Sequence, residues 1–183
     1  ALIGVKDAVW ALGRDRLRTA RAVDDLAGAD AGAAALEAFL SVQQALSAID
    51  RLEVRGRDSA GLHLLVRGHG LDLTSPAVAD ELAARADDPL FTSGAARTPE
   101  GHLGFVYKAA AEIGELGDNT AALRDAIRAD GLLHLALAAD TAELLVLGHT
   151  RWASVGIISQ PNAHPLNSDE QERVDGPYVT AVL

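Results

Sequence analysis

The chain has 183 residues, of which 49% are hydrophobic but only 4% aromatic, so its core must be built mainly from Ala, Leu and Val. A net charge of −10 and a pI of about 4.9 argue against a nucleic-acid partner, because such proteins gather Lys and Arg on one face. No run of transmembrane length and no signal-peptide pattern is present, which predicts a cytoplasmic protein without a membrane partner. The absence of cysteine excludes disulfides and thiolate metal sites.

The first fifty residues are expected to be helical. Apolar residues recur every three or four positions over 5–26, which predicts an amphipathic helix that ends near Gly28. A second apolar stripe over 33–49 predicts another helix, for which Asp30 is a candidate cap. Trp10 is expected to be a packing residue of the first helix, because Trp at helical spacing mostly buries area.

The middle of the chain alternates predicted strands, turns and helices. We expect a strand over 62–66, a tight turn at 68–70, a helix over 76–86 capped by Ser75, and a loop or weak strand over 91–101. A strand over 103–108, a helix or connection over 109–116 and a helix from Asp118 with a break at Gly131 should follow. His63 and His69 have no metal-ligand partner at diagnostic spacing, so they are interpreted as structural or exposed.

The last third of the chain carries its most informative stretch. A short apolar run over 143–147 predicts a buried strand, the polar run over 167–175 a solvated loop, and the residues over 178–183 a further strand. Arg151 and Trp152 follow the first of these strands. A strand end can aim a guanidinium at a ligand carboxylate through two parallel hydrogen bonds, although a structural ion pair is the alternative.

The order of residues around Arg151 adds a resemblance to a known family. The stretch Gly148-His149-Thr150-Arg151-Trp152-Ala153, followed by Asn162-Ala163-His164-Pro165, resembles the glutamine-binding loop of class II glutamine amidotransferases. Trp after the Arg is most similar to the glucosamine-6-phosphate synthase (glutamine–fructose-6-phosphate aminotransferase) branch. A block earlier in the chain, Arg55-Gly56-Arg57-Asp58-Ser59-Ala60-Gly61, resembles the Arg-Gly-Tyr-Asp-Ser-Ala-Gly segment of the same family. Residues 55–61 are called the first block below, and residues 148–165 the second.

The resemblance covers residues 46–183 and leaves residues 1–45 as a helical extension or insertion. It implies an α+β fold, a four-layer αββα sandwich of the N-terminal-nucleophile (Ntn) hydrolase type, of which this chain holds part. It also implies a glutaminase that releases ammonia from glutamine for a sugar phosphate such as fructose 6-phosphate, bound by a separate isomerase-like domain, in amino sugar biosynthesis.

The family's catalytic groups are not in the sequence. We expect the nucleophilic Cys upstream of Ala1 and the Asn-Gly oxyanion segment beyond Leu183, and therefore no catalytic residue in this chain. No metal and no cofactor is expected. A homo-oligomer is left open.

The resemblance also implies a role for each matching residue. Arg151 would bind the glutamine α-carboxylate, Trp152 would cover the site and gate the ammonia passage, and His164 would order the closed loop. Ser154 can supply the contact of the family's Thr, whereas Val155 cannot supply the imidazole of the family's His. The residues expected to support the site are Arg55, Asp58, Gly61, Thr150 and Asn162.

Three alternatives remain. An amidotransferase could use another acceptor, such as a phosphoribosyl diphosphate. A non-catalytic glutamine-binding or regulatory module could keep the loop without the nucleophile. A serine hydrolase is disfavoured, because the sequence around Ser59 is not the Gly-x-Ser-x-Gly elbow of such enzymes.

Overall fold

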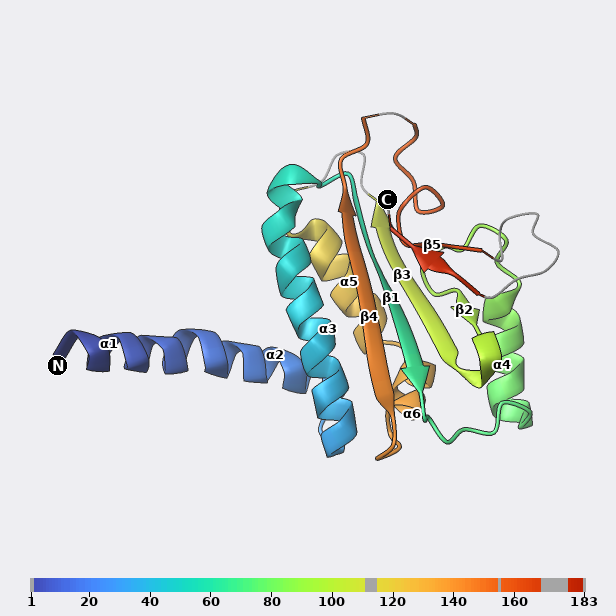
Figure 1. Ribbon diagram of the computed structural model, residues 1–183, viewed down its shortest axis with the longest axis horizontal. Helices are drawn as coiled ribbons and strands as arrows, with labels where there is room; N and C mark the ends of the chain where they lie inside the picture. The colour runs from blue at the N-terminus through green and yellow to red at the C-terminus, as the bar shows by residue number, and fades with distance from the viewer. Residues whose placement is uncertain (1, 111–114, 155, 169–177, 183) are drawn as a thin grey trace.

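The computed structural model describes residues 2–110, 115–154, 156–168 and 178–182. At its centre lies a four-stranded antiparallel sheet (Figure 1). In spatial order its strands are β2 (Ala96–Arg97), β3 (Leu103–Ala110), β1 (Ser59–Arg67) and β4 (Glu143–Arg151). A separate antiparallel pair is formed by β5 (Leu166–Asn167) and β6 (Thr180–Ala181). The chain is therefore α+β.

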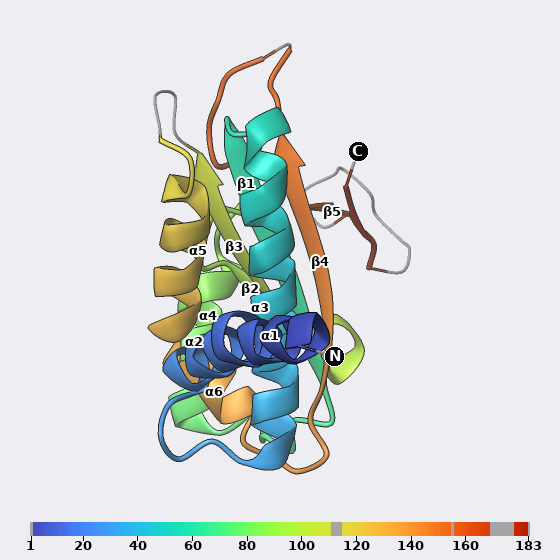
Figure 2. The ribbon, with the colours of Figure 1, turned by 90° about the vertical axis from the view of Figure 1, so that its left-hand side faces the viewer.

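Helices cover one face of the central sheet. The helices α3 (Ala33–Leu52) and α5 (Asp118–Arg128) lie side by side on it (Figures 1 and 2). The other helical elements that follow α3 in the chain are η2 (Glu53–Arg55), α4 (Pro76–Ala86), η3 (Pro99–Gly101) and α6 (Gly131–Ala136). Alternate strand residues such as Leu62, Leu64 and Phe105 are fully buried against Phe39 and Leu46 of α3 and their neighbours. The apolar side chains on one face of the strands thus pack against the apolar stripe of the helices.

A buried polar cluster ties α4 and α6 to the helix-covered face of the sheet. The carboxylate of Asp130 accepts hydrogen bonds from both terminal nitrogens of Arg85, at 2.9 and 2.6 Å. It also accepts from the Tyr107 hydroxyl at 2.7 Å and from the Leu133 amide at 3.1 Å. Burial raises the pKa of Asp130, but the bonds from Arg85 and Tyr107 outweigh it and hold the pKa below its ordinary value. The charge is therefore kept at neutral pH.

The N-terminal helix stands out from the rest of the molecule. It runs through α1 (Leu2–Trp10), the π-helical stretch η1 (Ala11–Arg16) and α2 (Leu17–Ala27), and ends at Gly28 with a φ of 79° (Figure 1). Only its last turns are buried, whereas Trp10 is 58% exposed. The predicted helix is confirmed, but the prediction that Trp10 packs is wrong, because this part of the helix lies on no other described element. None of the helices described is both long and apolar enough to span a membrane.

The helices end close to the predicted positions, but the side chains predicted to cap them do not do so. The break between α5 and α6 comes just before Gly131, as predicted. Asp30 does not cap α3, whose first turn follows Gly32. Ser75 precedes α4, yet its hydroxyl bonds the Asp72 carbonyl at 2.8 Å instead of a helix amide. Local sequence therefore locates helix ends, while the side chain that satisfies them depends on tertiary structure.

The strands near the C-terminus differ from the prediction in length and burial. The predicted strand over 143–147 extends to Arg151 as β4, an edge strand in which Leu145 is 64% exposed. The prediction of a buried strand is therefore wrong for that face. Of the predicted strand over 178–183, the structure describes residues 178–182, and among these only Thr180–Ala181 forms strand. The weak strand and loop over 91–101 are confirmed, whereas parts of the segments over 109–116 and 167–175 lie outside the described residues.

Candidate functional site

The candidate site lies on the face of the sheet opposite α3 and α5. Successive strand residues point to opposite faces, so Ser59 and Gly61 point away from the helices. In the register, Ser59 lies opposite Arg151, and Gly61 lies opposite His149 of β4 and Lys108 of β3. The face therefore carries one hydroxyl and three basic side chains around a central glycine.

Asp58 joins the two blocks of sequence that carry the family resemblance. Its amide donates to the Arg151 carbonyl at 3.1 Å, and its Oδ2 accepts from the Ala153 amide at 2.6 Å. The carboxylate thus fixes the turn in which Trp152 leaves the sheet. The resemblance implies a supporting role for Asp58, and these bonds place it between the two blocks.

Gly61 lies under the second block. A Cβ on Gly61 would stand 2.1 Å from the carbonyl oxygen of His164 and 3.2 Å from Cδ of Pro165. Such a contact with backbone is not tolerated, so the position requires glycine. Ala163, one residue earlier, is fully buried. The loop of residues 161–165 therefore lies directly on β1.

Arg151 holds the same loop from β4. The side chain is half-buried, and its Nη1 donates to the Asn162 carbonyl at 3.2 Å. The Asn162 side chain donates in turn to the Ile157 carbonyl at 3.1 Å. The guanidinium at the end of the rigid strand is thereby fixed beside the loop that is predicted to close over a ligand.

His164 stacks on His149, with ring centroids 4.8 Å apart and planes inclined by 29°. Burial lowers the pKa of His164, and the nearby His149, Arg151 and Lys108 lower it further. A neutral imidazole is therefore favoured at position 164 near neutral pH. This suits a role in ordering the loop.

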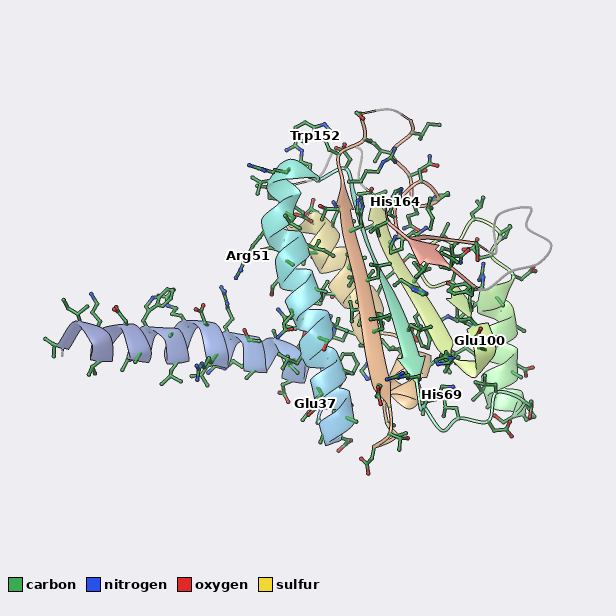
Figure 3. The ribbon with its side chains drawn as sticks, in the orientation of Figure 1. Glu37, Arg51, His69, Glu100, Trp152 and His164 are labelled. Atoms are coloured by element: carbon green, nitrogen blue, oxygen red, sulfur yellow. The ribbon has the colours of Figure 1, made fainter. Side chains whose placement is uncertain are left out.

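The remaining predicted residues lie farther from this cluster. Trp152 is 69% exposed at the outer end of β4, as Figure 3 shows, and Ser154 is also exposed. Arg55 is exposed on η2, and its side chain forms no hydrogen bond or ion pair with the part of the chain that the structure describes. Thr150 points to the other face, where its Oγ1 lies 3.0 Å from the place of a Cβ on Gly56. Val155 lies outside the described residues.

Ser59, Lys108 and His149 complete the cluster but are not among the predicted site residues. Ser59 is 2% exposed, and within the described ranges its hydroxyl has no hydrogen-bond partner. Ser59 begins β1 and is not at a strand-to-helix elbow, which agrees with the rejection of a serine hydrolase. His149 could have been found from the two-residue period if the strand had been extended to Arg151.

His63 and His69 are buried and have structural contacts, as predicted. His63 is 2% exposed and its Nε2 lies 3.2 Å from the Tyr178 hydroxyl. Burial, aided by the charge of Lys108, lowers its pKa to about 4. His69 bonds the Gly101 carbonyl and the Leu71 amide.

Comparisons with known proteins found no relative: no protein-family model, no curated protein and no solved structure matches the chain. Any function must therefore be argued from the two sequence blocks and from the geometry that joins them.

Proposed function

We propose that this chain binds glutamine and forms the glutamine-holding part of a class II glutamine amidotransferase. One observation carries the proposal: the two blocks that resemble this family meet in space. Asp58 of the first block bonds Ala153 of the second across 95 residues of sequence, and Gly61 lies under His164. Two unrelated chance matches would not be expected to fit together in this way.

Arg151 supplies the binding chemistry in this proposal. A guanidinium has five N–H donors in a planar fork, and the bond to Asn162 uses one of them. The proposal assigns to this fork a contact with the ligand carboxylate through two parallel hydrogen bonds, beside the loop that Arg151 already contacts. Closure of the loop over glutamine would exclude water from the amide that is to be hydrolysed.

Hydrolysis by the mechanism of this family needs a cysteine nucleophile, which the 183 residues do not contain. Attack on an amide requires a nucleophile, a base and donors for the developing oxyanion. The chain has no cysteine. The proposal therefore assigns to it the binding and orientation of glutamine, and assigns catalysis to a cysteine with a free α-amine and to an Asn-Gly pair outside this sequence.

The arrangement of layers supports an αββα sandwich of the Ntn-hydrolase type as the parent fold. α3 and α5 form a helical layer on one face of the sheet (Figures 1 and 2). On the other face, His63 of β1 contacts Tyr178, two residues before β6. In the proposed parent fold, the helices, the central sheet and the pair of β5 and β6 would belong to three successive layers.

The experiment that tests the proposal is calorimetric titration of the chain with L-glutamine. Arg151→Ala should weaken binding by about 2–5 kcal/mol, because it removes one partner of a charge-assisted pair. Arg67→Ala is the control, since Arg67 forms an exposed ion pair with Glu143 at the far end of the sheet. 4-Aminobutanamide, which lacks the α-carboxylate, should bind weakly to the wild type and be insensitive to Arg151→Ala. A change of less than twofold in glutamine affinity would remove Arg151 from the site.

Two further assays separate the alternatives. Release of glutamate by a longer polypeptide with an N-terminal cysteine would support the enzyme, whereas glutamine binding without release would favour a regulatory module. Amination of fructose 6-phosphate, and not of a phosphoribosyl diphosphate, would identify the acceptor that the Trp at position 152 indicates.

A further inference from the structure

His149 has no role in the proposed binding of glutamine, although it lies in the middle of the site. It precedes Arg151 by two residues on β4, so both side chains leave the same face of the sheet. In the register it lies opposite Gly61, where the missing side chain leaves room for the carbonyl of His164. The rings of His149 and His164 consequently stack, with centroids 4.8 Å apart.

The stack is one of several contacts that fix three consecutive loop residues. The Asn162 carbonyl accepts from Arg151, Ala163 is fully buried, and the next residue is His164 on the ring of His149. Because the three residues are consecutive, a shift of the imidazole at position 164 moves the carbonyl that orients the guanidinium. A displacement of about 1 Å at a binding group can reduce activity by a factor of about 100.

We propose that His149 is a positioning residue: its ring holds His164 and thereby keeps Arg151 aimed at the ligand carboxylate. The inference rests on the proposed function only for the identity of the ligand. The charged groups that face the two rings are Lys108 of β3 and Arg151 of β4, while β1 contributes the uncharged Gly61. A proton on His164 would place a further positive charge among these cations, and these neighbours together with burial lower its pKa.

Three variants of the chain test this role. His149→Ala removes the ring, His149→Phe keeps a ring that cannot take up a proton, and His102→Ala is a control at a histidine that bonds only local carbonyls of the η3 turn. NMR signals of the His164 imidazole report the stack directly, and titration with glutamine over a range of pH reports the site.

His149→Ala should shift the His164 signals and weaken glutamine binding about tenfold, the order expected for loss of a ring pair. His149→Phe should retain the affinity within about threefold, since the ring pair is conserved. It should also raise the pKa of His164, which NMR measures, because the nearby His149 is one of the groups that lower it. A residue that only fills space would leave this pKa unchanged.

The outcomes separate this inference from the proposed function. Unchanged His164 signals or unchanged affinity in His149→Ala would overturn the positioning role. So would a phenylalanine variant that binds as weakly as the alanine variant and leaves the pKa of His164 unchanged. If the wild type binds no glutamine at all, the proposed function fails, whereas a shift of the His164 signals in His149→Ala would still establish the stack.

Discussion

The backbone carbonyl of His164 lies on Gly61 so closely that a Cβ at position 61 would stand 2.1 Å from its oxygen. The contact joins the Asp-Ser-Ala-Gly block to the Asn-Ala-His-Pro block through backbone atoms. It also explains why a glycine interrupts a strand that is otherwise rich in leucine. The two blocks are thus parts of one structure.

Gly61→Ala should therefore displace the loop of residues 161–165. Backbone atoms of the loop, rather than a flexible side chain, oppose the new methyl group, so we expect overpacking to lower the free energy of unfolding by about 1–3 kcal/mol. Glutamine binding should weaken along with it. Gly131→Ala is the control, because a Cβ there would meet no atom within 4 Å. Denaturant unfolding and calorimetry measure both effects, and equal behaviour of the two variants would contradict the contact.

Glu53 provides a second prediction, away from the ligand loop. Its carboxylate is 1% exposed and accepts from the amides of Gly117 and Thr120 at the start of α5. Glu53→Ala would leave these donors buried without a partner, so the free energy of unfolding should fall by about 1–3 kcal/mol. Glu37→Ala, at an exposed position of α3, should change it by less than about 0.5 kcal/mol.

The same helix start supports the first sequence block. The Asn119 side chain donates to the Arg57 carbonyl at 2.7 Å, one residue before Asp58. Loss of the Glu53 cap should therefore also raise amide hydrogen exchange at Asp58. Unchanged exchange there, together with lower global stability, would show that the cap is not coupled to the site.

A third prediction concerns stability in acid. The pKa of His63 is lowered from 6.5 to about 4, chiefly by burial. As the pH falls from 6.5 to 4, the unfolded chain takes up a proton at His63 that the folded chain does not. The stability that the neutral ring contributes is therefore complete above pH 6.5. The free energy of unfolding falls by about 3 kcal/mol as the pH is lowered from 6.5 to 4. The lowered pKa of His164 acts in the same direction.

His63→Gln tests this origin of the acid loss. Urea unfolding of the variant at both ends of the window should give a smaller difference than the wild type shows. His102→Ala should keep the wild-type difference, because no buried imidazole is removed. If His63→Gln also keeps it, the loss arises from other groups.

The sequence predicted the order of elements well, because periodicity is a local property. The helix over 33–49 and the strands over 62–66 and 103–108 are all present. Contacts between distant segments were not predictable in the same way. The cap of α5 comes from Glu53, 67 residues before Thr120, and no local pattern indicates it.

The same limit explains the errors in exposure. Leu145 and Trp10 are apolar and suitably spaced for burial, yet each is more than half exposed. Whether an apolar residue is buried depends on what covers it, and periodicity does not reveal the covering element. In the candidate site, the sequence resemblance indicated Asp58, Gly61 and His164, which the structure brings together, but it gave no reason to include His149.

Trp152 gives the last prediction, which can be read from fluorescence. The chain has two tryptophans, Trp10 and Trp152, which are 58% and 69% exposed. In Trp10→Phe all tryptophan emission comes from Trp152, at the outer end of β4 (Figure 3). If Trp152 covers bound glutamine, addition of glutamine should move this emission to shorter wavelength, because the indole leaves water. In the reciprocal Trp152→Phe variant the emission of Trp10 should not respond. Equal responses would indicate a global change, and no response in Trp10→Phe despite measured binding would exclude Trp152 as a cover.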